Sequence, residues 1–363
     1  MVRKGVYGAL ITLILVIVFM ITYSLWVLGK EAMTGSIDTK RAINSHYNNG
    51  RFENEDKRVK QDFSKLGSIL KRYLFKKRIE PVPKSVPVVP IDHATLNETQ
   101  DHIYRLGHSS LLLNLSQSIW LIDPVFSDRA SPFSWTGPKR FHEVPLDLGP
   151  IPSITGVIIS HDHYDHLDKQ TIKMLSDKTE YFVVPLGLES HLIKWGVPRY
   201  KIYSLDWWEN INLQNLSITA TPSQHFSGRG LQDGNKTLWA SFVINTPKHK
   251  LFYSGDSGYF EGFKEIGKRF GPFDLTLIET GAYDKDWPDI HMFPEESVQA
   301  HIDLNGKVLM PVHNGTFDLA LHPWYEPFER LLTSAESQGV LTSIPKMGEA
   351  VPLSNPEKAF TWR

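Results

Sequence analysis

The segment SHDHYDHLD, residues 160–168, restricts the fold and the chemistry of this chain more than any other feature. An apolar run, GVIIS, leads into it, and a stretch of helical character, LDKQTIKML, follows. Four metal-ligand side chains stand within six residues: His161, His163, Asp165 and His166. A regular strand or helix cannot turn all four toward one ion, whereas a tight turn at a strand end can divide them. The spacing therefore predicts a loop in which His161 and His163 face one metal ion and Asp165 and His166 face a second.

The ligand types in this loop indicate the kind of metal. Imidazole and carboxylate groups are ligands suited to Zn²⁺, and two ions about 3.5 to 4 Å apart can act together on one substrate. The alternative is a histidine-rich surface loop that binds no metal. Cysteine is absent from all 363 residues, which excludes disulfide scaffolds, cysteine-ligated zinc, iron–sulfur clusters and thiol nucleophiles.

Residues 91–363 combine short apolar runs with stretches of helical character. The runs that predict strands are LLLNL, SIWLID, GVIIS, YFVVP, LSITATP, WASFVI, KLFYSGD, LTLIET and KVLMPVH. Helices are predicted in LDKQTIKMLSD, LESHLIKWG, PEESVQAHIDL and EPFERLLTSAESQ, the third with proline at its first position. Because these elements interleave without a steady strand–helix–strand repeat, we expect an α/β fold of layered sheets with outer helices. No glycine-rich phosphate-binding motif follows a strand.

An uncharged stretch near the amino terminus, residues 6–28, is long enough to cross a hydrocarbon layer of roughly 30 Å as a helix. We therefore predict a transmembrane anchor in residues 1–29, with a cleaved signal peptide and a buried core helix as the alternatives. Basic residues flank the stretch on both sides, so the positive-inside rule orients it only weakly. Because short amino-terminal tails usually stay inside, we expect a single-pass membrane protein whose body lies on the non-cytoplasmic side.

Residues 30–90 are predicted to form a basic connecting arm, with 14 Lys and Arg against 7 Asp and Glu. Apolar side chains at spacings of three and four between residues 63 and 74 predict an amphipathic helix. This helix could lie on an anionic membrane surface, or pack on the body with a solvated basic face. Residues 91–363 carry 23 basic and 33 acidic side chains, so this body is a poor candidate for binding nucleic acid.

The motif and several longer segments resemble the metallo-β-lactamase superfamily, whose metal-binding motif is HxHxDH. RLGHSSLLL, DPVFSDRASP, GPKRF, GAYD and HMFPEES are further similar to a branch of that superfamily, the N-acyl-phosphatidylethanolamine-hydrolysing phospholipases D and their bacterial relatives. The similarity extends over roughly residues 50–332. The resemblance implies that residues 91–363 form a four-layer αββα sandwich with two zinc ions at one edge of its sheets.

The resemblance also implies a ligand set, because the family adds a third histidine, a bridging aspartate and a last histidine downstream. The matching positions assign His161, His163 and His225 to the first zinc, and Asp165, His166 and His313 to the second, with Asp256 bridging the two. The catalytic residues are expected to be Asp165, Asp256 and His291, the last either as a contact to the substrate phosphate or in a structural role before a helix. Three more residues remain open: Asp123 and Asp162 are partners of the ligands or solvated aspartates, and His108 is a packed or hydrogen-bonded histidine rather than a ligand.

The activity implied by the resemblance is hydrolysis of N-acyl-phosphatidylethanolamine to N-acylethanolamine and phosphatidic acid by a membrane-anchored dinuclear zinc phosphodiesterase. Its partners are then the phospholipid substrate and the membrane, reached through the amino-terminal helix and the basic arm. Two alternatives remain: the same metal site acting on a small soluble substrate such as a lactone or a phosphorylated metabolite, and a membrane-bound scaffold without activity. The residues leave open zinc against manganese or iron, and the oligomeric state, a homodimer included.

Overall fold

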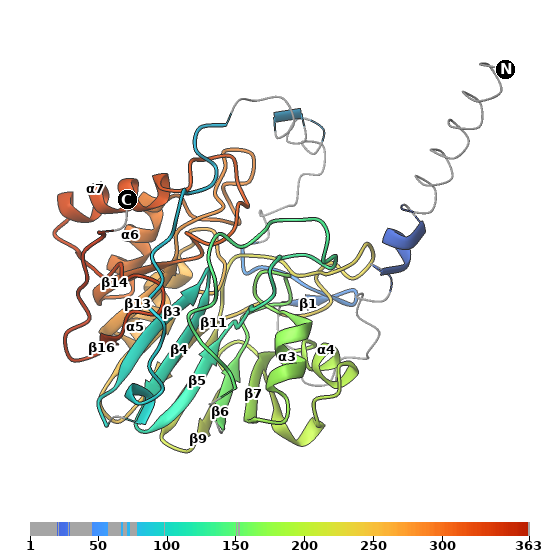
Figure 1. Cartoon of the computed structure of the whole chain (residues 1–363), viewed down its shortest axis with the longest axis horizontal. Coiled ribbons are helices and arrows are strands. Elements are labelled where there is room, and N and C mark those ends of the chain that lie inside the picture. The colour runs from blue at the N-terminus through green and yellow to red at the C-terminus, as the bar shows by residue number, and fades with distance from the viewer. Residues whose placement is uncertain are drawn as a thin grey trace.

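The computed structural model of the chain describes residues 20, 22–27, 29, 46–56, 67, 71–72, 78–97, 99–149, 151 and 153–361. Most of them belong to two seven-stranded sheets that pack face to face (Figure 1). The first sheet has the order β16 (Val351–Pro352), β3 (His102–Gly107), β4 (Ser110–Leu115), β5 (Ser118–Ile122), β6 (Ile154–Ile158), β7 (Thr179–Pro185) and β8 (Ile202–Leu205). The second has the order β15 (Leu341–Thr342), β14 (Gly306–Val312), β13 (Phe273–Glu279), β12 (Lys250–Tyr253), β11 (Ser241–Asn245), β10 (Leu216–Thr221) and β9 (Asn210–Leu213).

Both sheets are built on the same plan. In each, an antiparallel part continues into a parallel part: β3 to β5 are antiparallel and β5 to β8 parallel, whereas β9 to β12 are antiparallel and β12 to β15 parallel. Parallel neighbours end at the same edge of a sheet, and ligands bind beyond the carboxyl ends of such strands. The plan therefore creates one edge of the sandwich at which loops from both sheets meet.

The alternation of side chains between the two faces of each strand explains why the sheets have a core on either side. In β4, Leu111, Leu113 and Leu115 belong to the core between the two sheets, whereas Leu112 belongs to a second core on the outer face. Side chains on successive strand residues point to opposite faces, so a strand buried on both faces is apolar throughout. The short continuous apolar runs of the sequence are therefore strands covered on both sides.

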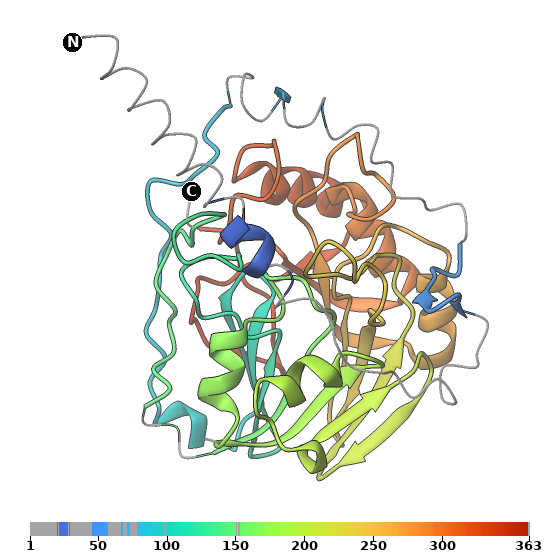
Figure 2. The same ribbon diagram turned by 90° about the vertical axis from the view of Figure 1, so that its right-hand side faces the viewer.

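Helices cover both outer faces. The second core packs against the first sheet and includes residues of α3 (Lys169–Leu175) and α4 (Glu189–Lys194). A third core packs against the second sheet and includes residues of α5 (Gly262–Phe270), α6 (Pro294–Asp303) and α7 (Glu326–Ser337). Figures 1 and 2 show α6 and α7 together on one side of the sheets, and α3 and α4 on the other. The expected αββα layering is present.

The remaining elements are short. A hairpin joins β1 (Tyr47–Asn48) and β2 (Arg51–Phe52), and single 3₁₀ turns occur at η2 (Thr95–Asn97) and η3 (Arg199–Lys201). The predicted strands and four predicted helices are confirmed, and α6 begins at the expected proline, Pro294. Helix α5 was missed because its sequence, GFKEIGKRF, contains two glycines, which have low helix propensity. Burial of Phe263 and Ile266 in the third core stabilises it.

The amino-terminal predictions lie largely outside the described residues. Of the predicted span 6–28, the structure describes residues 20 and 22–27, which are helical. Within the parts of the chain that the structure describes, no helix is both long and apolar enough to cross a bilayer. Of the predicted amphipathic helix 63–74, only residues 67, 71 and 72 are described.

The described residues of the segment predicted to be a connecting arm contact the rest of the chain. The Arg72 guanidinium lies 2.8 Å from the Asp284 carboxylate, and Arg78 Nη1 donates to Asp318 at 2.6 Å. Further along, the Val89 N–H donates to the Met347 carbonyl at 2.8 Å. These contacts attach residues 72, 78 and 89 to three segments: residues 281–291, residues 314–324 and the segment between β15 and β16.

Candidate metal centre

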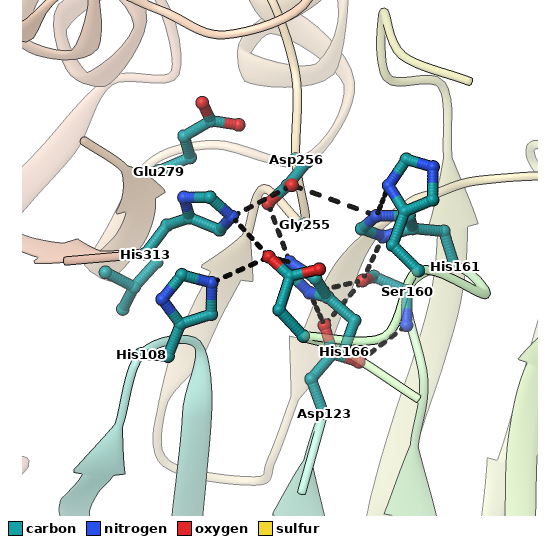
Figure 3. Close-up of polar contacts among 12 residues, drawn as sticks. His108, Asp123, Ser160, His161, His166, Gly255, Asp256, Glu279 and His313 are labelled. Atoms are coloured by element: carbon teal, nitrogen blue, oxygen red, sulfur yellow. Dashed lines mark hydrogen bonds and ion pairs between the residues drawn. The ribbon is translucent and has the colours of Figure 1, made fainter. Parts of the chain in front are cut away.

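The predicted ligands meet at the edge of the sandwich where strands of both sheets end. The loop with His161, His163, Asp165 and His166 follows β6 of the first sheet. His225 follows β10, Asp256 follows β12 and His313 directly follows β14, all strands of the second sheet. Figure 3 shows side chains from both sheets pointing into one space. Ligands separated by 152 residues in sequence, from His161 to His313, are thus brought into one cluster.

One group of donors contains three histidines and a carboxylate oxygen. His161 Nε2 lies 2.9 Å from His163 Nδ1, which lies 3.3 Å from His225 Nε2. Asp256 Oδ2 is 3.8 Å from His161 Nε2 and 3.7 Å from His225 Nε2. One ligand atom from each of the four residues lies within 4.8 Å of the others. Imidazole nitrogens and a carboxylate oxygen are donors that suit zinc.

A second group lies on the other side of Asp256. His166 Nε2 is 3.1 Å from Asp256 Oδ1, and His313 Nε2 is 3.0 Å from Asp256 Oδ2. Asp165 Oδ2 is 3.3 Å from His313 Nε2 and 3.7 Å from His166 Nε2. Because Asp256 contacts both groups, it occupies the position of a bridging carboxylate (Figure 3).

His108 adjoins this second group. Its Nε2 lies 2.9 Å from Asp165 Oδ2, and its ring centroid lies 4.0 Å from that of His313. Burial lowers the pKa of His108 to about 3; the nearby His313 contributes to this shift, and Asp165 opposes it. A neutral His108 therefore donates its Nε2–H to Asp165, in agreement with the hydrogen-bonded role expected from the sequence.

Hydrogen bonds to the far ring nitrogens orient the ligands. Asp123 Oδ2 accepts from His166 Nδ1 at 2.6 Å and from the Tyr253 hydroxyl at 2.5 Å, while Asp123 Oδ1 accepts from the Ser160 N–H at 2.7 Å. The Ile290 carbonyl accepts from His225 Nδ1 at 2.9 Å. A proton on Nδ1 leaves the Nε2 lone pair free for a metal, which is how neighbours of metal ligands usually act. Asp123, one of the residues left open, is therefore a fully buried partner of a ligand.

Asp162 is also buried, but its carboxylate accepts hydrogen bonds from the segment that follows His225. Its Oδ1 accepts from the Gly228 N–H at 2.7 Å, and its Oδ2 accepts from the Thr237 hydroxyl at 2.9 Å. These bonds connect the metal loop to the segment that follows His225. Asp162 thus holds the loops of the two sheets together.

In the metal-free chain, the charged side chains of the site shift one another's pKa values. Burial alone would lower the pKa of His313, but the charge of Asp256 and its hydrogen bonds with Asp165 and Asp256 outweigh burial and raise the pKa to about 10. The same balance, with Asp256 and Asp165 as the main charges, holds the pKa of His166 well above its usual value. Burial would raise the pKa of Asp256, but His166 and His313 hold it well below its ordinary range. Protons on two histidines thus balance the two carboxylates.

Three buried atoms test whether the residues fit a metal. Within the described part of the chain, His166 Nε2, His313 Nε2 and Asp256 Oδ1 make no well-aligned hydrogen bond, and their polar contacts are the ion pairs among the predicted ligands themselves, at 3.0 to 3.7 Å. Such atoms are costly to bury unless they are satisfied. Since all three converge on one space and are nitrogen or oxygen donors, the residues fit divalent metal ions.

A glutamate that sequence reasoning missed lies beside the ligands. Glu279, at the end of β13, is fully buried; its Oε1 accepts from His291 Nδ1 at 2.6 Å, and its Oε2 accepts from the Ser257 N–H at 2.6 Å. His291 itself lies next to the centre, with ring centroids 5.1 Å from His225 and 5.3 Å from His313. The signal in the sequence was an acidic residue closing an apolar run, LTLIET.

The fold and the site together define a metal-dependent hydrolase with an α/β sandwich and two adjoining groups of histidine and aspartate ligands. Residues 120–314, more than half of the chain, match the family described as "Beta-lactamase superfamily domain". The chain therefore belongs to the metallo-β-lactamase superfamily, as the sequence resemblance indicated.

Relatives and solved structures agree with this assignment. An uncharacterised protein of Mycobacterium tuberculosis is 45% identical over 287 residues, which cover 77% of this chain and 77% of the relative. The N-acyl-phosphatidylethanolamine-hydrolysing phospholipase D 1 of Caenorhabditis elegans is 32% identical over 288 residues, which cover 73% of this chain and 81% of the relative. The structure of Igni18, a metallo hydrolase of Ignicoccus hospitalis, aligns with a TM-score of 0.53 at 20% identity, covering 70% of this chain and 98% of that one. This last similarity shows the fold.

Proposed function

We propose that the chain is a dinuclear zinc phosphodiesterase of the phospholipase D type that hydrolyses N-acyl-phosphatidylethanolamine. The observation that carries the proposal is the position of Asp256, whose carboxylate contacts both ligand groups. Similarity to the nematode enzyme supports the choice of substrate. When bound, two zinc ions supply positive charge that activates water and neutralises phosphate oxygens.

The residues have separate roles in this proposal. His161, His163, His225 and Asp256 would hold one zinc ion, and Asp165, His166 and His313, with Asp256 beside them, would hold the other. Asp123 keeps the Nδ1 proton of His166 in place, and His108 orients Asp165. His291 donates Nδ1–H to Glu279, which fixes its ring beside the centre; a bond from Nε2 to a substrate phosphate oxygen requires a second proton, on Nε2.

The reaction is hydrolysis at phosphorus. Water attacks the phosphorus atom, and the bond between phosphorus and the ethanolamine oxygen breaks. The proton from water passes to the leaving oxygen, which gives N-acylethanolamine, and the remaining lipid is phosphatidic acid. No oxidant or further reactant is needed.

A cavity beside the metal loop supports an amphiphilic substrate. Its volume is about 840 Å³, and it adjoins the loop through Tyr164 and Leu167. Apolar Phe133 and Met174 and basic Lys173 contribute to its walls. Such a mixture suits a ligand with an acyl chain and a phosphate. Anchoring of residues 1–29 in a membrane, with the body on the non-cytoplasmic side, is part of the same proposal and would place the cavity near its lipid.

The test measures metal content and turnover together on the detergent-purified full chain, with N-acyl-phosphatidylethanolamine in mixed micelles. We expect about two zinc ions per chain and release of N-acylethanolamine, both reduced in an Asp165→Asn/His166→Ala variant. Asp101→Asn is the matched control, because Asp101 is a buried aspartate that precedes β3, at the end of the strand away from His108.

Each outcome separates the hypotheses. Two metals with turnover of a soluble ester or phosphodiester, but with no lipid product, would replace the lipid substrate with a small soluble one. A folded chain that binds no metal would refute the enzyme proposal and favour a scaffold. Loss of N-acylethanolamine release in detergent-purified protein lacking residues 1–29 would support a role of the anchor.

A further inference from the structure

Three basic side chains converge on the loop that follows the ligand His313, residues 314–317. Arg105 Nη2 donates to Asn314 Oδ1 at 2.7 Å. The Arg140 guanidinium carbon lies 5.2 Å from the centre of the Phe317 ring, and His142 Nε2 lies 3.0 Å from the Thr316 hydroxyl. Arg105 belongs to β3, whereas Arg140 and His142 lie between β5 and β6, so the cluster joins the first sheet to a loop of the second.

The two arginines are buried without an ion pair among the described residues. Arg105 is fully buried, and Arg140 exposes 9% of its surface. Arg105 faces the core between the sheets, as Ile103 does two residues earlier on the same strand. The charges of Asp168 and Asp128 act on Arg140, whose backbone N–H donates to the Asp128 carbonyl at 2.8 Å, but no carboxylate acts on Arg105.

Several polar hydrogens of the cluster have no acceptor. Arg140 Nη2 donates to the Val125 carbonyl, and Arg105 Nη2 to Asn314. Within the described part of the chain, Nε and Nη1 of Arg105 and Nε and Nη1 of Arg140 have no hydrogen-bond partner. Four buried nitrogens on two guanidinium groups therefore remain unpartnered beside one loop.

The cluster carries two positive charges. Burial lowers the pKa of Arg105 and of Arg140 to about 10, so both stay protonated near neutral pH. Burial lowers the pKa of His142 to about 4, with Arg140 and Arg105 contributing, so this ring is neutral. Its Nδ1 bonds the Glu143 carbonyl at 2.7 Å and must carry the proton, so Nε2 accepts from the Thr316 hydroxyl.

A glycine allows the basic side chains to approach the strand. A Cβ atom on Gly107 would lie 2.7 Å from His142 Cε1 and 2.9 Å from Arg140 Nη1, closer than side chains tolerate. The φ angle of Gly107, +126°, is also one that other residues rarely adopt. The end of β3 is thus shaped around the cluster.

An isolated buried charge costs several kcal/mol, and water satisfies hydrogen bonds without balancing the charge. An anion does both. We propose that Arg105 and Arg140 bind a small monovalent inorganic anion, with chloride as the natural representative, and that this anion stabilises the loop 314–317 behind the second metal position.

The first experiment compares the full chain in sodium chloride and in sodium gluconate at equal ionic strength. Chloride should raise the melting temperature by about 2 to 4 °C. Arg105→Gln and Arg140→Gln should abolish the difference. Arg269→Gln, which removes an exposed guanidinium paired with Glu265, is the control and should retain it.

The second experiment locates the anion without a variant. Crystals of the wild-type chain soaked in bromide should show an anomalous peak next to the Nε and Nη1 atoms of Arg105. This measurement decides the question even if Arg105→Gln fails to fold. Equal melting temperatures in the two salts together with no bromide peak at the cluster would overturn the proposal, and neither result depends on metal binding or turnover.

Discussion

The hydrogen bond between Asp123 and His166 provides the sharpest test of the metal centre. Asp123 is fully buried, and its carboxylate accepts from His166 Nδ1 at 2.6 Å, from the Tyr253 hydroxyl at 2.5 Å and from the Ser160 N–H at 2.7 Å. We consider the substitution Asp123→Asn, which keeps the size of the side chain and removes its charge.

The asparagine cannot reproduce these bonds in either orientation. An NH₂ group in place of Oδ1 would face the Ser160 N–H, so two donors would oppose each other. An NH₂ group in place of Oδ2 would force His166 to accept at Nδ1, which puts its proton on Nε2, the atom that faces Asp256. The second metal position would then lose a ligand lone pair.

The expected loss of affinity at this position is about 10- to 100-fold, equivalent to about 1.4 to 2.8 kcal/mol. The assay is zinc content per chain after dialysis against a series of zinc buffers. The occupancy step of one position should stay near its wild-type midpoint, while the step of the position that contains His166 should move to higher free zinc. Asp101→Asn, which changes a buried aspartate that accepts from the Ser116 N–H, is the control and should leave both steps in place.

The reasoning would be refuted if Asp123→Asn and Asp101→Asn gave the same two midpoints as the wild type in folded protein. Circular dichroism on each variant separates this result from unfolding. A loss of both zinc ions at once would also contradict the assignment, because His161, His163 and His225 do not bond Asp123 directly.

Three further predictions follow from the contacts. Glu279→Gln weakens the hydrogen bond that orients His291 and should lower kcat about 10-fold at unchanged zinc content. Steady-state kinetics on the zinc-bound protein checks this, and an unchanged kcat would contradict it. In chelator-treated protein, Asp256 raises the pKa of His313 to about 10, against 6.5 in the unfolded chain. The protonated ring therefore stabilises the fold fully below pH 6.5, and this stabilisation is lost as the pH rises toward 10. The melting temperature should fall across this range, whereas a constant melting temperature would argue against the pairing. Arg78→Gln removes the ion pair with Asp318 and should cost about 1 kcal/mol in chemical denaturation, a change that an equal midpoint for the variant and the wild type would exclude.

Local sequence was sufficient to predict the metal-ligand turn and most elements. HDHYDH is recognisable because all its donors lie in one turn, and apolar runs bounded by glycine, proline and aspartate mark the strands. His225, Asp256 and His313 followed from the order of a family pattern, each at the end of an apolar run. The turn and the apolar runs depend on residues that are neighbours along the chain, so they can be recognised in the sequence directly.

The partners of the ligands depended on the order and register of the strands. Asp123 meets His166 because neighbouring strands of the first sheet end side by side, and Glu279 meets His291 beyond the end of β13. Arg105 meets Asn314 across 209 residues because strands of the two sheets end at a common edge. An isolated aspartate or arginine is usually solvated, so local sequence favours the exposed state for both. Burial and pairing are properties of the packed sandwich, in which free energy depends on contacts between distant segments, and these contacts exist only once the sheets are assembled.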